Sequence, residues 1–528
     1  MKRFAALLDG LLHAPARTAK LRLIEDYLAQ TPDPARGYAL AALTGGLSFN
    51  EAKPKAIRDL AASRVDPVLL DLSYDYVGDL AETVALIWPA ESEADPPSLT
   101  DVVTTLQTAS RREVPRLLES WLDQLDATGR WALLKLITGG LRVGVSARLA
   151  RTALAQWGNQ PVEEVEELWH DLTPPYAAMF AWLGGAAERP SSAGGLGFRP
   201  LMLAHPLEEA DLAALDPTLF RAEWKWDGIR VQMVSRPDGK RLYSRTGDDV
   251  GHAFPDILAA MDFDAVLDGE LLVRKPDGTL GSFNDLQQRL NRKAPPASLI
   301  QSHPAFVRLY DMLFDGGEDV RALPFDARRA RLEAWHARRH NSVFDLSDRL
   351  PVESWDTLAT LRHGAAADRE GLMLKRFDSP YVSGRPKGLW FKWKRDPKTV
   401  DAVLMYAQRG HGKRSSFYSD FTFGCWRPDG RGGLELVPVG KAYFGFTDEE
   451  LGQLDRWVRN HTTNRFGPVR EVEQALVLEI AFEGIQASTR HKSGIALRFP
   501  RVSRIRWDKP AAEADVVETL QRLIDEAG

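Results

Sequence analysis

The chain has 528 residues, which is too many for a single hydrophobic core, so we expect about two to four domains. Hydrophobic residues make up 44% and charged residues 27%, a composition typical of soluble globular proteins, and no apolar run is long enough to cross a bilayer. The net charge of −5 excludes a protein coated in positive charge but leaves room for local nucleic-acid-binding patches. Because Cys425 is the only cysteine, an intrachain disulfide and a cysteine-rich zinc site are both excluded.

The first two hundred residues have the periodicity of helices. Asp9 interrupts the first apolar stretch, which favours an amphipathic helix over a signal peptide and predicts a cytoplasmic protein. Thr18 precedes a helical pattern as its expected N-cap, and Ser98–Asp101 has the form of a capping box. The loop Gly139–Val145 is either a helix-to-helix turn or a backbone that lies against phosphates with the help of Arg142, and periodicity alone favours the turn.

A linker is followed by a change of pattern. The segment Arg189–Gly197 is rich in residues that resist regular structure, so it is predicted to join two domains. Short strands then dominate, which predicts an α+β arrangement with antiparallel strands at 230–234, 241–244 and 265–273 and helices around 285–291 and 326–339. From about Val400 the spacing predicts a small barrel, with strands at 400–408, 417–426, 434–439 and 476–483 and a closing helix at about 511–526.

The stretch Glu223–Arg230 contains the strongest candidate for covalent chemistry. Lys225 lies between Trp224 and Trp226, just before an Asp-Gly turn. A lysine nucleophile must lose its proton near neutral pH, which burial or neighbouring cations promote. The pattern Lys-x-Asp-Gly alone is weak, because Lys275 begins a second copy in which proline and glycine indicate an ordinary hairpin turn.

Charged residues further along the chain supply partners for such a lysine. Strand alternation places Lys392 and Lys394 on one face of an aromatic segment, although an exposed basic edge strand is an equally good interpretation. Glu270 and Glu370 lie in apolar segments, where a carboxylate is costly unless it is paired or binds a metal, and the two together suit Mg²⁺ that bridges phosphate oxygens. Arg245 at a strand end could grip a phosphate through both of its terminal nitrogens.

Taken in order, these residues resemble the motifs of the ATP-dependent DNA ligases of the covalent nucleotidyltransferase superfamily, over essentially the whole chain. Glu223–Arg230 is similar to the first motif of that family, and Ser244–Gly247 to its Ser-Arg-x-Gly element. The resemblance implies that Lys225 is the catalytic lysine, which carries AMP. It also implies ATP-binding roles for a wider set of residues: Glu223, Arg230, Arg245, Glu270, Tyr310, Arg385, Lys392 and Lys394.

The resemblance assigns individual tasks within this set. Glu223 would read the adenine, and Tyr310 would stack on it where many members have phenylalanine. Arg245 would also meet the 5′-phosphate of DNA. Glu270 would contact the ribose or the metal, and Glu370 would be a metal ligand. Arg385 is the candidate for an arginine that the family often carries shortly before the fifth motif, here at a looser spacing.

Residues outside the pocket receive roles from the same resemblance. The segment Arg498–Lys509 is similar to the sixth motif, which implies that four of its residues orient pyrophosphate: Arg504, Arg506, Asp508 and Lys509. DNA would be bound by residues of the helical region and of the loop that follows the first barrel strand: Arg142, Arg409, Lys413 and Arg414. For that barrel loop, a flexible charged hairpin is an equally good interpretation without the resemblance.

The resemblance implies three domains. They are an all-α DNA-binding domain over residues 1–197, an α+β nucleotidyltransferase domain with ATP-grasp-like antiparallel sheets over 198–396, and an OB-fold β-barrel over 397–528. The cofactors would be ATP, whose AMP is carried on the lysine, and Mg²⁺, for which Mn²⁺ could substitute. The partner would be nicked double-stranded DNA, with no membrane and with the enzyme as a monomer. A hinge near Asp396–Lys398 would let the barrel move between steps.

Three alternatives remain to be weighed. A ligase that uses NAD would bring an NAD-specific module and a four-cysteine zinc site, which the single cysteine and the helical first domain oppose. An RNA ligase or a capping-type nucleotidyltransferase shares the first five motifs but is opposed by the helical region and the sixth motif. A non-catalytic DNA-binding protein would have lost the lysine or the carboxylates, and all of them are present.

Overall fold

The computed structural model describes residues 1–49, 51–77, 79–89, 94–190, 195–275, 277–290, 292, 294–339, 341–366, 368–409, 418–443, 447–489 and 491–525. The chain separates into two compact units, one formed by residues 1–157 and 397–528 and the other by residues 158–396. No helix in the described ranges is both long and apolar enough to cross a membrane. The division into three domains at residues 197 and 396 stays a prediction.

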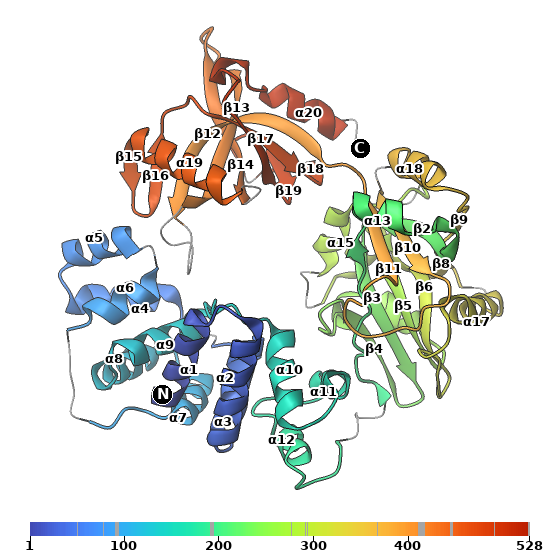
Figure 1. The fold of residues 1–528 in the computed structure, drawn as a ribbon, viewed down its shortest axis with the longest axis horizontal. Helices are drawn as coiled ribbons and strands as arrows, with labels where there is room; N and C mark the ends of the chain where they lie inside the picture. Colours follow the sequence, from blue (N-terminus) through green and yellow to red (C-terminus); the bar gives the residue numbers. More distant parts are fainter. Residues whose placement is uncertain are drawn as a thin grey trace. The chain divides into compact units, whose positions relative to one another are not determined.

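The N-terminal region is helical (Figure 1). Its helices are α1 (Lys2–His13), α2 (Arg17–Gln30), α3 (Ala35–Thr44), α4 (Pro54–Arg64), α5 (Pro67–Val77), α6 (Leu80–Ile87), α7 (Leu99–Thr108), α8 (Val114–Gln124), α9 (Ala127–Thr138), α10 (Ala147–Trp157), α11 (Val162–Trp169) and α12 (Ala177–Leu183). Of these, α11 and α12 belong to the unit 158–396.

Two helix boundaries test the sequence predictions. The capping box is confirmed, because the side chain of Ser98 accepts from the Asp101 N–H while the side chain of Asp101 accepts from the Ser98 N–H. The prediction of Thr18 as an N-cap is wrong, since α2 begins at Arg17 with Ala16 before it and no side-chain cap. The buried apolar face of a helix can fix its start without a cap.

The unit 158–396 contains two mixed sheets in which most neighbours are antiparallel. In the first, the strand order is β1 (His205–Pro206), β11 (Trp390–Lys394), β10 (Arg369–Arg376), β2 (Phe220–Trp226) and β9 (Arg349–Leu350). In the second, it is β4 (Gly239–Ser244), β3 (Ile229–Arg236), β5 (Ala265–Val273), β6 (Ala305–Asp315) and β7 (Glu318–Asp319), with β8 (Phe344–Leu346) also paired to β6. The helices are α13 (Glu209–Ala214), α14 (Pro255–Ala260), α15 (Phe283–Leu290), α16 (Ala297–Ser302), α17 (Phe325–Ala337) and α18 (Trp355–His363).

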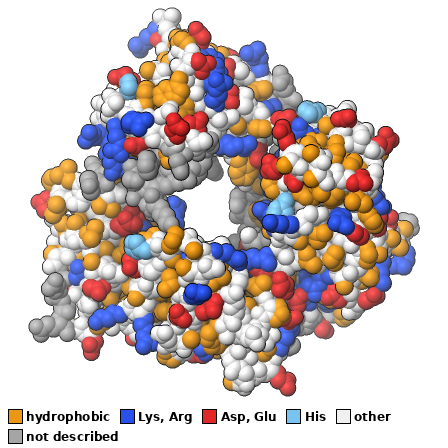
Figure 2. All heavy atoms as spheres, viewed as in Figure 1, with side chains coloured by type: hydrophobic (Ala, Val, Ile, Leu, Met, Phe, Trp, Pro, Cys, Tyr) orange, Lys and Arg blue, Asp and Glu red, His pale blue; other side chains and the backbone are white. Residues whose placement is uncertain are grey.

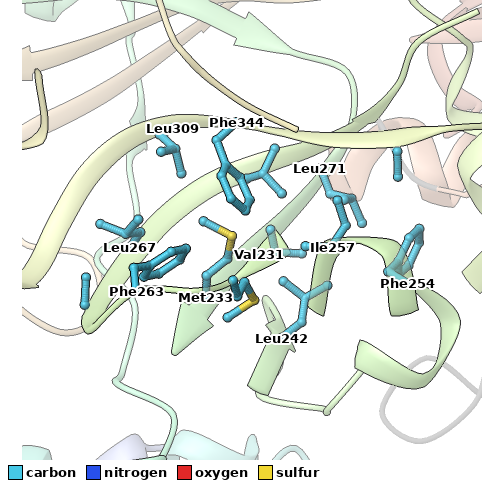
Figure 3. Close-up of a cluster of buried hydrophobic side chains, with 14 of the residues drawn as sticks. Val231, Met233, Leu242, Phe254, Ile257, Phe263, Leu267, Leu271, Leu309 and Phe344 are labelled. Carbon is cyan, nitrogen blue, oxygen red and sulfur yellow. The ribbon is translucent and has the colours of Figure 1, made fainter. Parts of the chain in front are cut away.

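A buried apolar cluster lies on one face of the second sheet (Figure 3). Val231 and Met233 from β3 pack there with Leu267 and Leu271 from β5, and α14 adds Ile257. Side chains alternate across a strand, so the opposite face of the same sheet carries polar residues between the apolar ones. That face packs against the first sheet and carries part of the candidate site, the rest of which comes from the strands of the first sheet.

The C-terminal region is a second antiparallel sheet domain. Its strands are β12 (Lys398–Arg409), β13 (Tyr418–Pro428), β14 (Leu434–Tyr443), β15 (Thr462–Phe466), β16 (Val469–Val472), β17 (Val477–Phe482), β18 (Gly484–Ala487), β19 (Ile495–Arg498) and β20 (Arg501–Arg506). β12 pairs with β13, β16 and β17, and β20 pairs with β17 and also contacts β14, which closes the sheet toward a barrel. The helices are α19 (Asp448–Asn460) and α20 (Val517–Asp525).

The closing helix begins later than predicted. A short 3-10 turn occupies Ala511–Glu513, and α20 starts only at Val517. Asp515 explains the delay, since its N–H donates to the Asp401 carbonyl and its carboxylate accepts from the Asp401 N–H, both at 2.8 Å. These bonds hold the chain in a non-helical conformation before α20.

Acidic and basic side chains are interspersed on the face shown in Figure 2, as the small net charge leads one to expect. No large uniformly basic surface is seen in this view. On this face, positive charge is therefore present as local groups of side chains.

Candidate nucleotide-binding site

Lys225 lies near the end of β2, where that strand pairs with β10. Gly371 is its neighbour across the strands, and a β-bulge between Arg369 and Gly371 interrupts the register beside Glu370. The amine of Lys225 donates a hydrogen bond to Oε2 of Glu370. The amine of Lys394, on β11, lies 3.7 Å from the same oxygen. One carboxylate thus gathers two of the predicted cations.

The two copies of Lys-x-Asp-Gly have different surroundings. A Cβ atom on Gly228 would lie 2.5 Å from the Leu271 carbonyl oxygen and 2.8 Å from Cγ of Glu270, so only glycine lets the connection between β2 and β3 pass this close to β5. In the second copy, Gly278 has φ +86° and open space around it, and its N–H donates to the Lys275 carbonyl at 2.9 Å. The Lys275 copy is the ordinary turn that the sequence predicted.

Glu270 brings a second carboxylate to the pocket. It lies opposite Arg230 on β3 and opposite Arg308 on β6. Burial raises the pKa of the Glu270 carboxyl to about 8; Lys225 and Arg230 oppose the rise, and Glu370 adds to it. The two carboxylates therefore lie close enough to repel one another. Such a pair fits Mg²⁺, which binds through one or two carboxylates together with substrate phosphates.

Within the part of the chain that the structure describes, no group of three or more histidine, cysteine or acidic residues is arranged to hold a metal ion.

A set of basic side chains surrounds Lys392 on β11. Burial lowers the pKa of the Lys392 amine, and four neighbouring cations lower it further: Lys394, Arg385, Lys225 and Arg245. The structure thus brings together five of the six basic residues predicted for the site, all except Arg230, and includes Arg385 despite its looser spacing. A phosphate chain bound here would add its negative charge to that of Glu370 and reduce the repulsion among these cations.

Glu223 on β2 and Tyr310 on β6 both lie beside the amine of Lys375. Glu223 is 1% exposed, and its carboxylate accepts from Lys375 at 2.8 Å and from Arg329 at 3.2 Å. The Lys375 amine also lies 4.4 Å from the centre of the Tyr310 ring. Lys375 and Arg329 were not predicted. Lys375 stands on β10 five residues after Glu370, so plain alternation would place the two on opposite faces, and the bulge beside Glu370 breaks that alternation.

Arg230 lies beneath the pocket in a buried ion pair. It donates two hydrogen bonds to Asp268, at 3.0 and 2.5 Å, and others to the Met202 carbonyl at 2.8 Å and the Tyr381 hydroxyl at 3.1 Å. The Tyr381 hydroxyl also donates to Asp268 at 2.8 Å. Sequence reasoning missed Asp268 and Tyr381 as partners. The predicted contact between Arg230 and the nucleotide stays a prediction.

The residues of the sixth motif gather around Asp401 in the C-terminal domain. Oδ2 of Asp401 accepts from Arg506 at 2.9 Å and from Lys509 at 2.8 Å. Arg506 also donates to both carboxylate oxygens of Asp508, at 3.0 and 2.9 Å, whereas Arg504 is exposed. Asp401 was not predicted, because it lies at the start of the barrel, far from this motif in the sequence.

Two of the four predicted DNA contacts, Arg142 and Arg409, lie in the part of the chain that the structure describes. Arg142 is exposed in the loop between α9 and α10, and the Lys20 amine on α2 donates to the Val143 and Gly144 carbonyls of that loop, at 2.9 Å each. Arg409 is the last residue of β12. Lys413 and Arg414 lie outside the described residues.

Family models and sequence relatives that match this chain are all DNA ligases. Residues 201–394 match the family model of the ATP dependent DNA ligase domain, and residues 414–509 match that of the ATP dependent DNA ligase C terminal region. A "Probable DNA ligase" of Koribacter versatilis is 30% identical over 99% of this chain and 96% of its own length. "DNA ligase 1" of Korarchaeum cryptofilum is 29% identical over 99% of this chain and 98% of its own. A solved structure named Pmar-Lig_PreS3 has a TM-score of 0.60 at 16% identity, covering 95% of this chain and 99% of that one, and confirms the fold.

Proposed function

The chain belongs to the ATP-dependent DNA ligases, and from that premise we propose that Lys225 is the residue that takes AMP from ATP. Enzymes of this family seal nicks through an adenylate intermediate. The observation that carries the proposal is the position of the Lys225 amine, bonded to Glu370 and close to Lys392 and Lys394. An amine placed among phosphate-binding cations is suited to attack on a phosphorus atom.

Three displacements at phosphorus follow from this arrangement. The Lys225 nitrogen attacks the α-phosphorus of ATP, an N–P bond forms, and the bond to pyrophosphate breaks. The AMP then passes to the 5′-phosphate at a nick, which frees the lysine. Finally the 3′-hydroxyl attacks that activated phosphate and AMP leaves. Each step develops negative charge on phosphate oxygens, which Lys392, Lys394 and Arg245 neutralise.

Mg²⁺ is the metal that the site fits best. Glu270 and Glu370 would hold it, and Mn²⁺, with similar oxygen ligands, could replace it. When bound, the ion supplies positive charge to the phosphate oxygens. The protein itself holds two carboxylates close together. Burial and the charge of Glu370 raise the pKa of Glu270, so the ionised pair is unfavourable without a cation.

Selectivity for ATP would come from the adenine end of the pocket. Tyr310 offers an aromatic face for stacking. Glu223 is held in place by hydrogen bonds from Lys375 and Arg329, and its carboxylate would accept from the base. Such a fixed acceptor favours the amino group of adenine over the carbonyl group of guanine.

Nicked duplex DNA is the proposed substrate, bound by a monomer. Arg142, Arg409, Lys413 and Arg414 would contact phosphates, and Arg504, Arg506, Asp508 and Lys509 would orient pyrophosphate during the first step. The unit 158–396 ends at Asp396, which supports a hinge at Asp396–Lys398 that lets the barrel residues act in one step and withdraw in another.

Incubation with α-labelled ATP and Mg²⁺, followed by denaturing electrophoresis, tests the proposal. The wild-type protein should retain label. Lys225→Ala should retain none, and Lys275→Ala, which removes the lysine of the turn copy, should label normally. Label that survives Lys225→Ala would overturn the assignment.

The same assay separates the alternatives. Labelling from GTP in preference to ATP would indicate a capping-type enzyme, and labelling from NAD would indicate the other ligase family. Adding DNA with a single nick should discharge the label and join the strands, whereas a joined product found only with RNA would indicate an RNA ligase.

A further inference from the structure

The loop that carries Arg245 is a tight turn at the end of β4. The Gly247 N–H donates to the Ser244 carbonyl at 3.0 Å, and the Ser244 N–H donates to the Asp248 carbonyl at 2.9 Å. Arg245 is exposed, whereas Gly247 is buried. The buried side of the turn must therefore be covered by another part of the chain.

His170, which follows α11, provides that cover. A Cβ atom built on Gly247 would lie 2.2 Å from Cε1 of His170 and 2.6 Å from each ring nitrogen. Gly247 also has φ +87°, a conformation that other residues rarely adopt. The imidazole ring thus occupies the space where a side chain at position 247 would be. The His170 ring therefore restricts the turn on its buried side, opposite the exposed Arg245.

Aromatic packing connects His170 to the strand that leads into the loop. The His170 ring lies edge-on to Phe198, with centroids 4.8 Å apart, and Phe198 lies edge-on to Tyr243 at 5.7 Å. Tyr243 immediately precedes Ser244, and its hydroxyl donates to the Leu196 carbonyl at 2.9 Å. His170 therefore contacts the turn directly at Gly247 and contacts the end of β4 through Phe198 and Tyr243.

The helix that carries His170 is itself anchored in the unit 158–396. Glu167 pairs with Arg321 at 2.5 Å, and Glu166 accepts from the Ser383 hydroxyl at 2.8 Å. Both partners belong to segments next to the two sheets, after β7 and between β10 and β11. His170 is thus presented to Gly247 by a helix that cannot shift without breaking these contacts.

We propose that His170 is a positioning residue: it fixes the turn from which Arg245 reaches the 5′-phosphate of the nick. This rests on the role proposed for Arg245. The effect is steric, since the flat ring fills the space above Gly247, and it makes α11 part of the phosphate-binding apparatus. The glycine of the Ser-Arg-Thr-Gly element is required here because His170 leaves no room for a side chain.

Single-turnover transfer of AMP from the adenylylated enzyme to nicked DNA measures this role. His170→Ala should slow the transfer about tenfold, because small displacements of a substrate-binding group reduce rates by one to two orders of magnitude. His170→Phe, which keeps a flat ring, should remain close to the wild type. In an Arg245→Ala background, His170→Ala should cause no further loss, because its effect passes through that arginine.

Two further variants make the test decisive. Gly247→Ala should slow the transfer, and adding His170→Ala should restore part of the loss by removing the clash. His303→Ala, whose imidazole contacts Ser302 rather than this loop, is the control. The proposal is overturned if His170→Ala transfers AMP at the wild-type rate, if its loss is undiminished in the Arg245→Ala background, or if His170→Phe is as slow as His170→Ala. A wild-type protein that takes no label from ATP would instead refute the proposed function.

Discussion

Lys225 and Glu370 are joined by a hydrogen bond across the paired strands β2 and β10. Their side chains are 23% and 18% exposed, so the pair is shielded yet reachable by a nucleotide. The carboxylate that accepts from Lys225 is also a proposed metal ligand. Metal binding to Glu370 therefore competes with the bond to the amine and would free the amine for attack.

Replacing Glu370 should separate metal binding from release of the Lys225 amine. Glu370→Gln keeps an acceptor oxygen for Lys225 but loses the charge, so we expect self-adenylylation to slow by about one to two orders of magnitude. Raising the Mg²⁺ concentration should recover part of the rate. The measurement is the initial rate of labelling across a Mg²⁺ titration, with Glu209→Gln on α13 as the control. An unchanged Mg²⁺ dependence would show that Glu370 is not a ligand.

The pKa of Glu270 predicts how stability depends on pH in metal-free buffer. The carboxyl titrates at about 8 in the folded protein and at 4.5 as a reference, so between these values the folded state binds more protons than the unfolded state. The free energy of unfolding should therefore fall as pH rises from 4.5 toward about 8. Glu270→Gln should remove most of this slope in denaturant titrations with a chelator present. Parallel slopes for the two proteins would contradict the assignment.

The buried pair of Arg230 and Asp268 should stabilise the catalytic unit. Asp268 is fully buried, and Asp268→Asn would leave the guanidinium without its counter-charge, at a cost of about 3–5 kcal/mol in the free energy of unfolding. Asp264→Asn breaks an exposed pair with Arg236 and should cost less than about 1 kcal/mol. Guanidinium denaturation compares the two, and equal losses would argue against a special role for Asp268.

Much of the site follows from local pattern. The strand Ala265–Val273 was predicted with the bounds that β5 has, and its alternation places Glu270 on the face opposite the apolar core. Lys392 and Lys394 were predicted on one face of a strand, and both contribute to the cationic set around the pocket. The two-residue period of a strand and the order of the motifs are therefore enough to predict a site residue when its position depends only on the strand that carries it.

The remaining features depend on contacts between distant segments. Asp268 and Tyr381 are 113 residues apart, and nothing in either local sequence indicates that they share Arg230. Glu223 accepts from Lys375, which lies on the bulged strand β10, and from Arg329, which lies on α17. Only packing in three dimensions brings that strand and that helix to Glu223. Such pairings arise from tertiary structure, so a single sequence does not reveal them.

Arg142 should contribute to DNA binding through charge alone. Arg142→Ala should weaken the binding of nicked duplex and reduce the slope of log affinity against log salt by about one unit, because one phosphate contact is lost. Arg58→Ala, which removes an exposed arginine paired with Asp71, is the control and should leave the slope unchanged. Fluorescence anisotropy over a range of KCl concentrations measures both. A loss of affinity without a change in slope would mean that Arg142 supports the loop rather than a phosphate.

Asp401 should matter only for the step that releases pyrophosphate. Its Oδ2 atom binds both Arg506 and Lys509, so Asp401→Asn would remove the charge that holds these two cations together. We expect self-adenylylation to slow by about tenfold or more, because the leaving group would lose its oriented partners. Sealing of DNA that already carries AMP at its nick involves no pyrophosphate and should proceed at the wild-type rate. Glu435→Gln, which breaks the exposed pair with Arg427 in the same domain, is the control and should affect neither step. If Asp401→Asn slows both steps equally, the residue supports the barrel fold instead of the pyrophosphate-orienting cluster.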